Sequence, residues 1–261
     1  MRQKKIVYGM LHVRALPGTP LNNLSMLEII TKSVEEANVY LEEGLDGLIL
    51  ENMHDVPYLN GNCGAEVIAG MTAVATEIRK LTDKPIGIQI LAGCNKEALA
   101  VAHIAGLEFI RAEGFVYGHV ADEGMMNSCA GELLRYRKAI GAEKVKVYTD
   151  IKKKHSSHAI TADLDITDHA SAAQFFLSDG LIITGTSTGV PASCDELKRV
   201  RKVTSLPILI GSGLNTENIS KFYPLADDFI VGSHFKVDGQ WQNELDIERI
   251  KQFIVVFRSL K

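Results

Sequence analysis

The sequence lacks the features that mark membrane proteins and nucleic-acid-binding proteins. No apolar run approaches the roughly 20 residues that a helix needs to span a bilayer, and the basic first residues lead into a short strand rather than the hydrophobic region of a signal peptide. The basic run 152–154 is short and is offset by nearby acids, so it does not form the positive stripe that binds nucleic-acid backbones. We therefore expect neither membrane insertion nor a nucleic-acid partner.

Cysteine is scarce as well. The chain has four cysteines, and no two of them stand close enough in the sequence for a metal knuckle or a redox motif: Cys63, Cys94, Cys129 and Cys194. We interpret them as reduced thiols and expect a cytoplasmic protein. The formal net charge of -4 and the 46% of hydrophobic residues are ordinary for a globular protein that buries a core.

The chain does contain a regular alternation of short apolar runs with amphipathic segments. The apolar runs predict strands over residues 6–11, 45–50, 85–91, 109–113, 145–151, 181–184, 207–210 and 229–231. The amphipathic segments predict helices over residues 26–43, 65–81, 96–105, 132–140, 170–177, 194–203, 216–223 and 246–257. Strict alternation predicts a parallel sheet covered by helices.

The length of the chain favours one closed barrel. Its 261 residues are close to the roughly 250 that a (β/α)₈ barrel uses, and no Pro- or Gly-rich linker divides them. We predict a single domain over residues 1–261, folded as an α/β TIM barrel, with an open doubly wound sheet as the alternative. Long segments follow several strands, which is how this architecture builds a site at the strand exits.

The last two predicted strands each run into a corner of small residues. The first corner is Gly211-Ser212-Gly213, and the second is Gly232-Ser233. Glycine removes the Cβ that would keep a ligand off the backbone, and a helix beginning directly after the corner would present N–H groups to an anion. Loops after strands seven and eight commonly bind phosphate in such barrels. We predict a phosphate site here; the alternative is that each glycine only makes a tight turn.

The segment after the sixth predicted strand is rich in hydroxyls and small residues. It reads Thr184-Gly185-Thr186-Ser187-Thr188-Gly189, and Gly185 and Thr186 are its candidate phosphate-binding residues. We expect them to hydrogen-bond a sugar or the third side of the phosphate. The alternative is an ordinary turn, with Ser193 capping the next helix.

Polar side chains gather at the exits of the earlier strands. Side chains alternate along a strand, so Asp150 and Lys152 share the inward face of strand five with Lys146 and Tyr148. By the same alternation, Arg111 and Glu113 point inward from strand four. Glu51 ends strand two, and His12 follows strand one. The candidate catalytic residues are therefore six side chains: His12, Glu51, Arg111, Glu113, Asp150 and Lys152.

Two interpretations of this charged set stay open. In a catalytic site, Glu51 and Asp150 are the candidate bases, Lys152 is the candidate acid or Schiff-base nucleophile, and Arg111 orients the substrate or stabilises negative charge. In a structural network, Arg111 pairs with Glu113 or Glu51, and Lys152 pairs with Asp150, because buried charges need partners.

A metal is the competing use of some of these groups. Glu51, Asp150, His12, His155 and His158 offer oxygen and nitrogen ligands, but their spacing matches no compact metal motif. We assign no metal site and no certain cofactor. If a divalent cation binds, carboxylate ligands favour Mg²⁺ or Mn²⁺ over Zn²⁺.

A series of motifs resembles the BtpA/SgcQ family over nearly the whole chain. These motifs include Gly9-Met-Leu-His12, Leu16-Pro-Gly-Thr-Pro20, Gly47-Leu-Ile-Leu-Glu51-Asn52, Phe109-Ile-Arg111-Ala-Glu113, Asp150 with Lys154-His155, Gly211-Ser-Gly213 and Gly232-Ser233. The resemblance implies a barrel of the ribulose-phosphate-binding type. Cyanobacterial members are linked with the stability of photosystem I, and other bacterial members are associated with sugar-uptake operons.

The residues together predict an enzyme that acts on a phosphorylated sugar or phosphoribosyl compound, by isomerase, lyase or hydrolase chemistry at the mouth of the barrel. The alternative is a non-catalytic assembly or stability factor that keeps the barrel and binds a protein partner. A homo-oligomer is the default expectation for a soluble protein of this kind.

Overall fold

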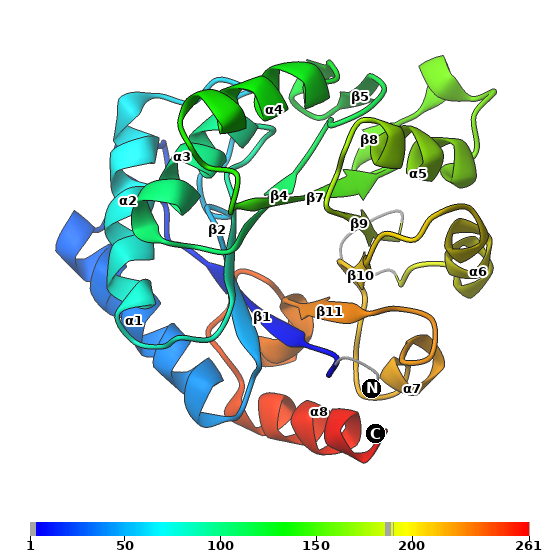
Figure 1. The fold of residues 1–261 in the computed structure, drawn as a ribbon. Coiled ribbons are helices and arrows are strands. Elements are labelled where there is room, and N and C mark those ends of the chain that lie inside the picture. Colours follow the sequence, from blue (N-terminus) through cyan, green and yellow to red (C-terminus); the bar gives the residue numbers. More distant parts are fainter. Residues whose placement is uncertain (1–3, 186–188, 190, 261) are drawn as a thin grey trace.

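The computed structural model describes residues 4–185, 189 and 191–260. Parallel strands close into a barrel in the order β1-β11-β10-β9-β7-β4-β3-β2 (Figure 1). These strands are β1 (Val7–His12), β2 (Gly47–Glu51), β3 (Ile86–Gln89), β4 (Phe109–Ala112), β7 (Lys146–Ile151), β9 (Gly180–Ile183), β10 (Ile208–Ile210) and β11 (Asp228–Val231). The predicted TIM barrel is confirmed, and each predicted strand overlaps a strand of the barrel.

The helices form a ring outside the barrel (Figure 1). They are α1 (Met26–Glu42), α2 (Ala65–Arg79), α3 (Asn95–Ala105), α4 (Ala130–Ala139), α5 (Ile166–Phe175), α6 (Cys194–Val203), α7 (Ile219–Phe222) and α8 (Ile247–Ser259). Helix α1 begins where the sequence provides a capping box, in which Ser25 and Glu28 each accept the other's backbone N–H. Within the described ranges, no helix combines the length and apolar character that crossing a membrane requires.

One predicted helix is much shorter than expected. The sequence predicts a helix over 216–223, but α7 has only 4 residues. The side chain of Asn218 accepts the N–H of Asn215, and the side chain of Asn215 accepts the N–H groups of Glu217 and Asn218. These side chains hold a turn where a helix was expected, because asparagine competes with helical hydrogen bonding. The expectation of a helix beginning directly after the first glycine corner is therefore wrong.

Two apolar layers fix the barrel. The larger layer lies between the strands and the ring of helices. The smaller layer fills the barrel interior with Tyr8, Met10, Ile49, Phe109, Tyr148, Ile182, Leu209 and Ile230. Within this layer Phe109 packs against Tyr8 and Tyr148, with ring centroids 5.3 and 5.0 Å apart. This layer fills the interior between the carboxyl end of the barrel, where the cavities described below lie, and the amino end, where Lys146 and Asp228 begin their strands.

A small antiparallel sheet that the sequence did not predict stands over the strand exits. It has the order β6-β5-β8, with β5 (His119–Ala121), β6 (Gly124–Met126) and β8 (Ser156–Ser157). It joins the long segment after β4 to the long segment after β7. Short 3₁₀ turns complete the remaining connections: η1 (Ala159–Thr161), η2 (Ser233–Phe235) and η3 (Val237–Gly239).

Candidate functional site

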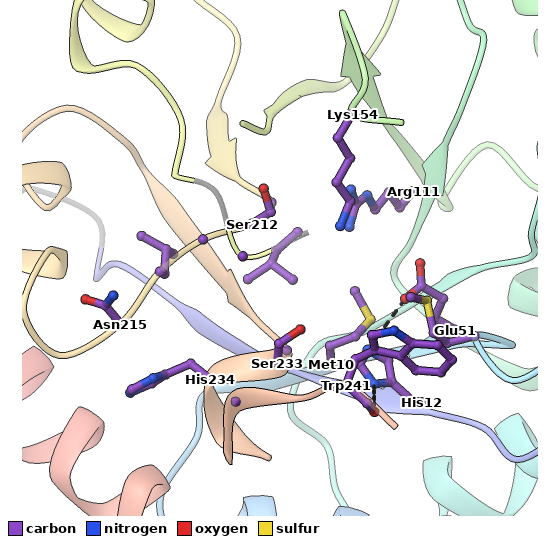
Figure 2. Close-up of a pocket in the computed structure, with 18 of the residues that line it drawn as sticks. Met10, His12, Glu51, Arg111, Lys154, Ser212, Asn215, Ser233, His234 and Trp241 are labelled. Carbon is purple, nitrogen blue, oxygen red and sulfur yellow. Dashed lines mark hydrogen bonds and ion pairs between the residues drawn. The ribbon is translucent and has the colours of Figure 1, made fainter. Parts of the chain in front are cut away.

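The carboxyl ends of the strands surround two adjoining cavities. The corner cavity has a volume of about 200 Å³ and is bordered by both glycine corners (Figure 2). The carboxylate cavity has a volume of about 310 Å³ and lies toward β3, β4 and β7. The two cavities share part of their lining: Glu51, Met53, Arg111, Lys154 and Trp241. The two cavities therefore meet at these residues.

The structure brings the two predicted phosphate corners together. Gly211, Ser212 and Gly213 follow β10, Gly232 and Ser233 follow β11, and all of them line the corner cavity. The N–H of Gly211 donates to Ile183 across the sheet, so this glycine provides space rather than a donor. In the part of the chain that the structure describes, no hydrogen bond engages the backbone N–H of Gly213, Gly232 or Ser233. These three amides are candidate anion donors.

The segment after β9 contributes differently from the expectation. The N–H of Gly185 donates to the hydroxyl oxygen of Ser212 at 3.2 Å. Gly185 therefore supports the first corner, and Gly189 is the glycine of this segment that lines the corner cavity. Thr186, the other residue predicted to bind phosphate here, lies outside the described residues.

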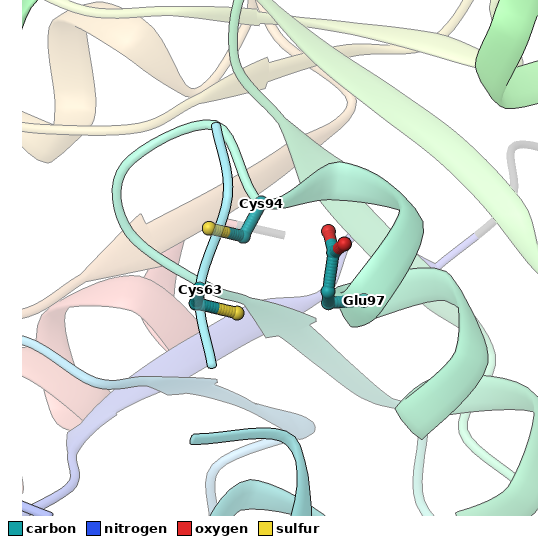
Figure 3. Close-up of side chains that lie close together, drawn as sticks. All are labelled: Cys63, Cys94 and Glu97. Atoms are coloured by element: carbon teal, nitrogen blue, oxygen red, sulfur yellow. The ribbon is translucent and has the colours of Figure 1, made fainter. Parts of the chain in front are cut away.

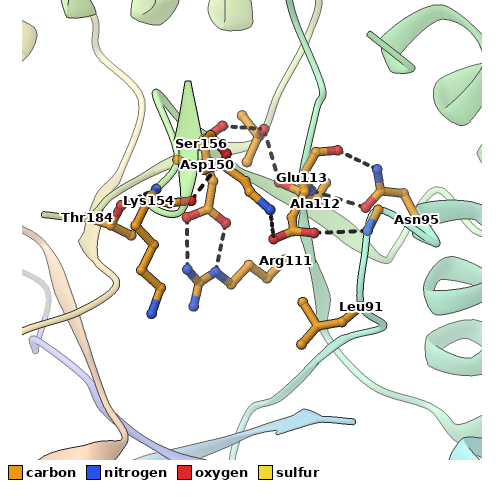
Figure 4. A network of polar contacts seen from close by, with 12 residues as sticks. Leu91, Asn95, Arg111, Ala112, Glu113, Asp150, Lys154, Ser156 and Thr184 are labelled. Carbon is orange, nitrogen blue, oxygen red and sulfur yellow. Dashed lines mark hydrogen bonds and ion pairs between the residues drawn. The ribbon is translucent and has the colours of Figure 1, made fainter. Parts of the chain in front are cut away.

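Arg111 and Asp150 form a buried bidentate pair on the neighbouring strands β4 and β7. The Arg111 Nε and Nη2 atoms each lie 2.8 Å from an Asp150 oxygen (Figure 4). The two side chains are 5% and 1% exposed. The structural alternative, in which Arg111 pairs with Glu113 or Glu51 and Lys152 pairs with Asp150, is therefore wrong. Because both oxygens of Asp150 accept from Arg111, Asp150 holds the guanidinium in place and is a poor candidate for the base.

Glu113 points inward as predicted and has partners of its own. One of its oxygens accepts from Lys153 Nζ and the other from the N–H of Gly93, both at 2.9 Å (Figure 4). Asn95 also bonds both the N–H and the C=O of Glu113. Glu113 therefore ties the loop after β3 to the segment after β7.

The prediction that Lys152 faces the barrel interior is wrong. Strand β7 ends at Ile151, and Lys152 has a φ of 47°, which breaks the alternation of side chains. Its Nζ donates to the C=O of Leu164 at 3.1 Å. The following two lysines take the inward positions, because Lys153 lines the carboxylate cavity and Lys154 lines both cavities. The only sequence feature that could have indicated Lys153 and Lys154 was the basic run 152–154.

Glu51, Lys154 and His12 have shifted proton affinities where the two cavities meet. Burial raises the pKa of Glu51, while burial and the nearby Arg111 lower the pKa of Lys154. Burial and the charge of Lys236 lower the pKa of His12 well below its usual value. His12 Nε2 lies 3.7 Å from a Glu51 oxygen. Each shift favours the neutral form. The shifts of Glu51 and Lys154 move their pKa values toward neutrality, which suits groups that exchange protons near neutral pH, whereas the lowered pKa of His12 keeps that ring uncharged.

The relatives of this chain share nearly its whole length. The sequence profile of the BtpA family matches residues 3–259. The chain belongs to the BtpA family. A Caenorhabditis elegans relative, whose name places it in the mitochondrion, is 49% identical over 99% of this chain and 95% of its own length. The photosystem I biogenesis protein BtpA of Synechocystis sp. is 30% identical over 95% of this chain and 86% of its own length.

Solved structures that resemble this BtpA-family chain are TIM barrels of the ribulose-phosphate-binding type. The (S)-3-O-geranylgeranylglyceryl phosphate synthase of Thermoplasma acidophilum superposes with a TM-score of 0.63 at 14% identity, over 99% of this chain and 95% of that one. The 3-hexulose-6-phosphate synthase of Salmonella typhimurium gives 0.61 at 14% identity, over 98% and 100%. At this level of identity the likeness shows the fold alone.

The ligand set considered for Mg²⁺ or Mn²⁺ does not converge in this BtpA-family site. Asp150 is engaged by Arg111, and the Nε2 atom of His158 lies 3.1 Å from the C=O of Lys153. Glu51 and His12 remain as neighbours at the mouth. A divalent cation there would have to complete its coordination with substrate oxygens and water.

Trp241 is a site residue that the sequence did not identify. It lines both cavities, and its C=O lies 3.2 Å from the Nδ1 atom of His12. Its ring also packs against His54, with centroids 5.1 Å apart. The only signal in the sequence was a lone tryptophan in a polar segment after the last strand.

A cluster of three histidines lies beside the small sheet. The ring centroids of His119 and His158 are 5.4 Å apart, and those of His158 and His169 are 6.2 Å apart. Burial lowers the pKa of both His119 and His169 to about 4. Because the unfolded chain binds these protons near pH 6.5, acidification between about pH 6.5 and pH 4 favours unfolding.

We expect the free energy of unfolding to fall by about 1–2 kcal/mol for each of these histidines between about pH 7 and pH 5. Replacing His119 or His169 by glutamine should remove part of that slope in urea titrations at each pH. The matched control is His103→Gln, because His103 is exposed on α3 and should leave the slope unchanged. Equal slopes for all three variants would contradict this prediction.

Proposed function

We propose that this chain is an enzyme that acts on a phosphorylated sugar or phosphoribosyl compound. The observation that carries the proposal is the meeting of the two glycine corners at one cavity, which opens into a second cavity with acid–base groups. Arg111, Lys154 and Arg249 line the corner cavity and make it attractive to a doubly charged anion. A sugar phosphate has a charged end for the first cavity and a polar body for the second.

The backbone donors would bind the phosphate. Gly213, Gly232 and Ser233 line one cavity, and each charge-assisted hydrogen bond from a backbone N–H would contribute about 1.5–3 kcal/mol. Gly213 has a φ of 72°, which other residues adopt only with strain. The first corner therefore depends on glycine for its shape.

The proton-transfer groups would act on the body of the substrate. Glu51 is the proposed base, and Lys154 takes the role of acid that the sequence assigned to Lys152. Arg111, held by Asp150, would stabilise negative charge on a substrate oxygen. This arrangement supports isomerase or lyase chemistry that removes a proton next to a carbonyl, and also hydrolysis.

The structural neighbours support the same class of ligand. One of them was crystallised with sn-glycerol-1-phosphate, and another is named a 3-hexulose-6-phosphate synthase. Both names describe those proteins, and they agree with the phosphate site proposed here.

We propose that the protein lies in the cytoplasm. The name of the C. elegans relative suggests the mitochondrion as the alternative, and fractionation of the source cells distinguishes the two.

A thermal-shift titration tests the proposed phosphate site. Inorganic phosphate and ribose 5-phosphate should stabilise the protein, by about 2.7 kcal/mol at a concentration about 100 times Kd, whereas ribose should have no effect. The Gly232→Ala variant should raise the Kd for inorganic phosphate at least about tenfold. A Cβ at this position would lie 3.4 Å from His12 Nε2, among residues that line the cavity. Gly131→Ala, in helix α4, is the matched control.

A second candidate function is a non-catalytic assembly factor, which the Synechocystis relative's name favours. No stabilisation by any phosphate ester, with or without added Mg²⁺, would overturn the enzyme proposal and favour this candidate.

A further inference from the structure

Two cysteines from separate loops meet outside the cavities described above. Cys63 ends the loop after β2, and Cys94 directly precedes α3 at the end of the loop after β3 (Figure 3). Cys63 is 8% exposed and Cys94 is fully buried. Glu97, in the first turn of α3, lies beside them. One ligand atom from each of the three side chains lies within 4.8 Å of the other two.

The donor set fits a thiophilic divalent cation. Zn²⁺ binds thiolate sulfur at about 2.3 Å and carboxylate oxygen at about 2.0–2.2 Å, which places neighbouring ligand atoms roughly 3.5 Å apart in a tetrahedron. The three donors lie within 4.8 Å of one another and would have to draw closer to reach that spacing. Sulfur ligands select zinc over Mg²⁺ or Ca²⁺. We propose that Cys63, Cys94 and Glu97 form a zinc site, with the fourth position taken by water.

A bound cation would allow these three side chains to lie close together in their ionised forms. Two thiolates and a carboxylate in one largely buried place repel one another unless a cation lies between them. A divalent cation would reduce the local charge to -1, which water at the fourth position can solvate. Uncharged thiols would pack there without a cation, so the binding experiment decides between the two states.

The site would fasten two loops that form one wall of the carboxylate cavity. Tyr58, from the loop after β2, and Leu91, from the loop after β3, both line that cavity. The loops already exchange two backbone hydrogen bonds, from Gly61 to Ala92 and from Ala92 to Leu59. Since the cysteines do not line the cavity, the cation would be structural, and this inference does not depend on the proposed function.

Cobalt binding tests the site on the full chain. Protein that has been reduced and freed of metal by a chelator is titrated with Co²⁺, and Zn²⁺ is then added as a competitor. We expect one equivalent of Co²⁺ to bind, with thiolate-to-cobalt charge-transfer absorption in the near ultraviolet that Zn²⁺ abolishes. Cys63→Ser and Cys94→Ser should each lose this absorption, and Glu97→Gln should weaken binding at least tenfold. Cys194→Ser is the matched control, and it should bind Co²⁺ like the unmodified chain.

Three results would overturn the proposal. The first is a folded, reduced chain that shows no thiolate-to-cobalt absorption. The second is unchanged absorption in Cys63→Ser or Cys94→Ser. The third is a disulfide between the two cysteines, seen as a loss of two hydrogens by mass spectrometry, in a chain that still fails to bind Co²⁺ after reduction. Circular dichroism of each variant establishes that it is folded, and Glu97→Gln provides the test if a serine variant does not fold.

Discussion

Replacing Arg111 by methionine is expected to lower the free energy of unfolding by about 3–5 kcal/mol. Methionine keeps much of the volume of the arginine stem, so the loss comes mainly from charge. Asp150 would remain in a site where its side chain is 1% exposed, with both of its bidentate hydrogen bonds removed. Urea denaturation followed by circular dichroism measures the change.

The matched control for this prediction is the double variant in which Asp150 is also replaced by asparagine. Removing the second charge leaves no unpaired ion, so the double variant should regain much of the lost stability. If the single variant does not fold, recovery of a folded double variant gives the same answer. A single variant within about 1 kcal/mol of the unmodified chain would show that water reaches the pair and that it contributes little.

The barrel could be predicted from sequence because each of its strands has a local signal. Apolar runs of three to seven residues alternate with amphipathic segments throughout, and the side-chain period within a strand is fixed by backbone geometry. Arg111 and Glu113 illustrate the second point, since both face inward as alternation in strand four requires. The glycine corners were predictable because consecutive strands of a barrel are neighbours in space.

The errors arose where the backbone leaves regular geometry. We expected the inward and outward alternation of side chains in strand five to continue to Lys152. It does not, because Lys152 adopts a positive φ directly after β7. The helix expected after Gly213 fails because the side chains of Asn215 and Asn218 bond nearby amides. The sequence indicates the positive φ of Lys152 and the asparagine turn less strongly than it indicates the strand and helix patterns that they interrupt.

Contacts between distant loops could not be predicted at all. The pairing of Val120 with Ser157 in the small sheet joins the loops after β4 and β7, and neither short strand has a periodic pattern of its own. The approach of Cys63 to Cys94 likewise follows from the adjacency of β2 and β3, whereas their spacing in the sequence indicates nothing. Such contacts depend on the closed barrel and on how each loop packs over it.

Replacing Lys154 by methionine is expected to lower kcat by roughly 10²–10⁴-fold for any phosphate ester that the protein turns over. The pKa of Lys154 is lowered by burial and by Arg111, so its ammonium gives up a proton more readily than an exposed lysine. Methionine keeps most of the length of the side chain and removes that proton. Glu51→Gln should have an effect of similar size, because the raised pKa of Glu51 suits a group that accepts and returns a proton.

Proton exchange with solvent provides a readout for this prediction for any isomerase or lyase reaction that removes a carbon-bound proton. Candidate esters are incubated with the protein in D₂O, and loss of a carbon-bound proton signal is followed by NMR. Lys96→Met is the matched control, because Lys96 pairs with Glu132 on the surface and should leave the rate unchanged. Both active-site variants should still be stabilised by inorganic phosphate, since the corner amides remain. Lys154→Met should be stabilised less than Glu51→Gln, because Lys154 lines the corner cavity. If both variants exchange at the rate of the unmodified chain, Glu51 and Lys154 take no part in the proposed chemistry. If phosphate stabilises the unmodified chain but no exchange occurs, the phosphate site stands and the result points to hydrolysis at the same cavity.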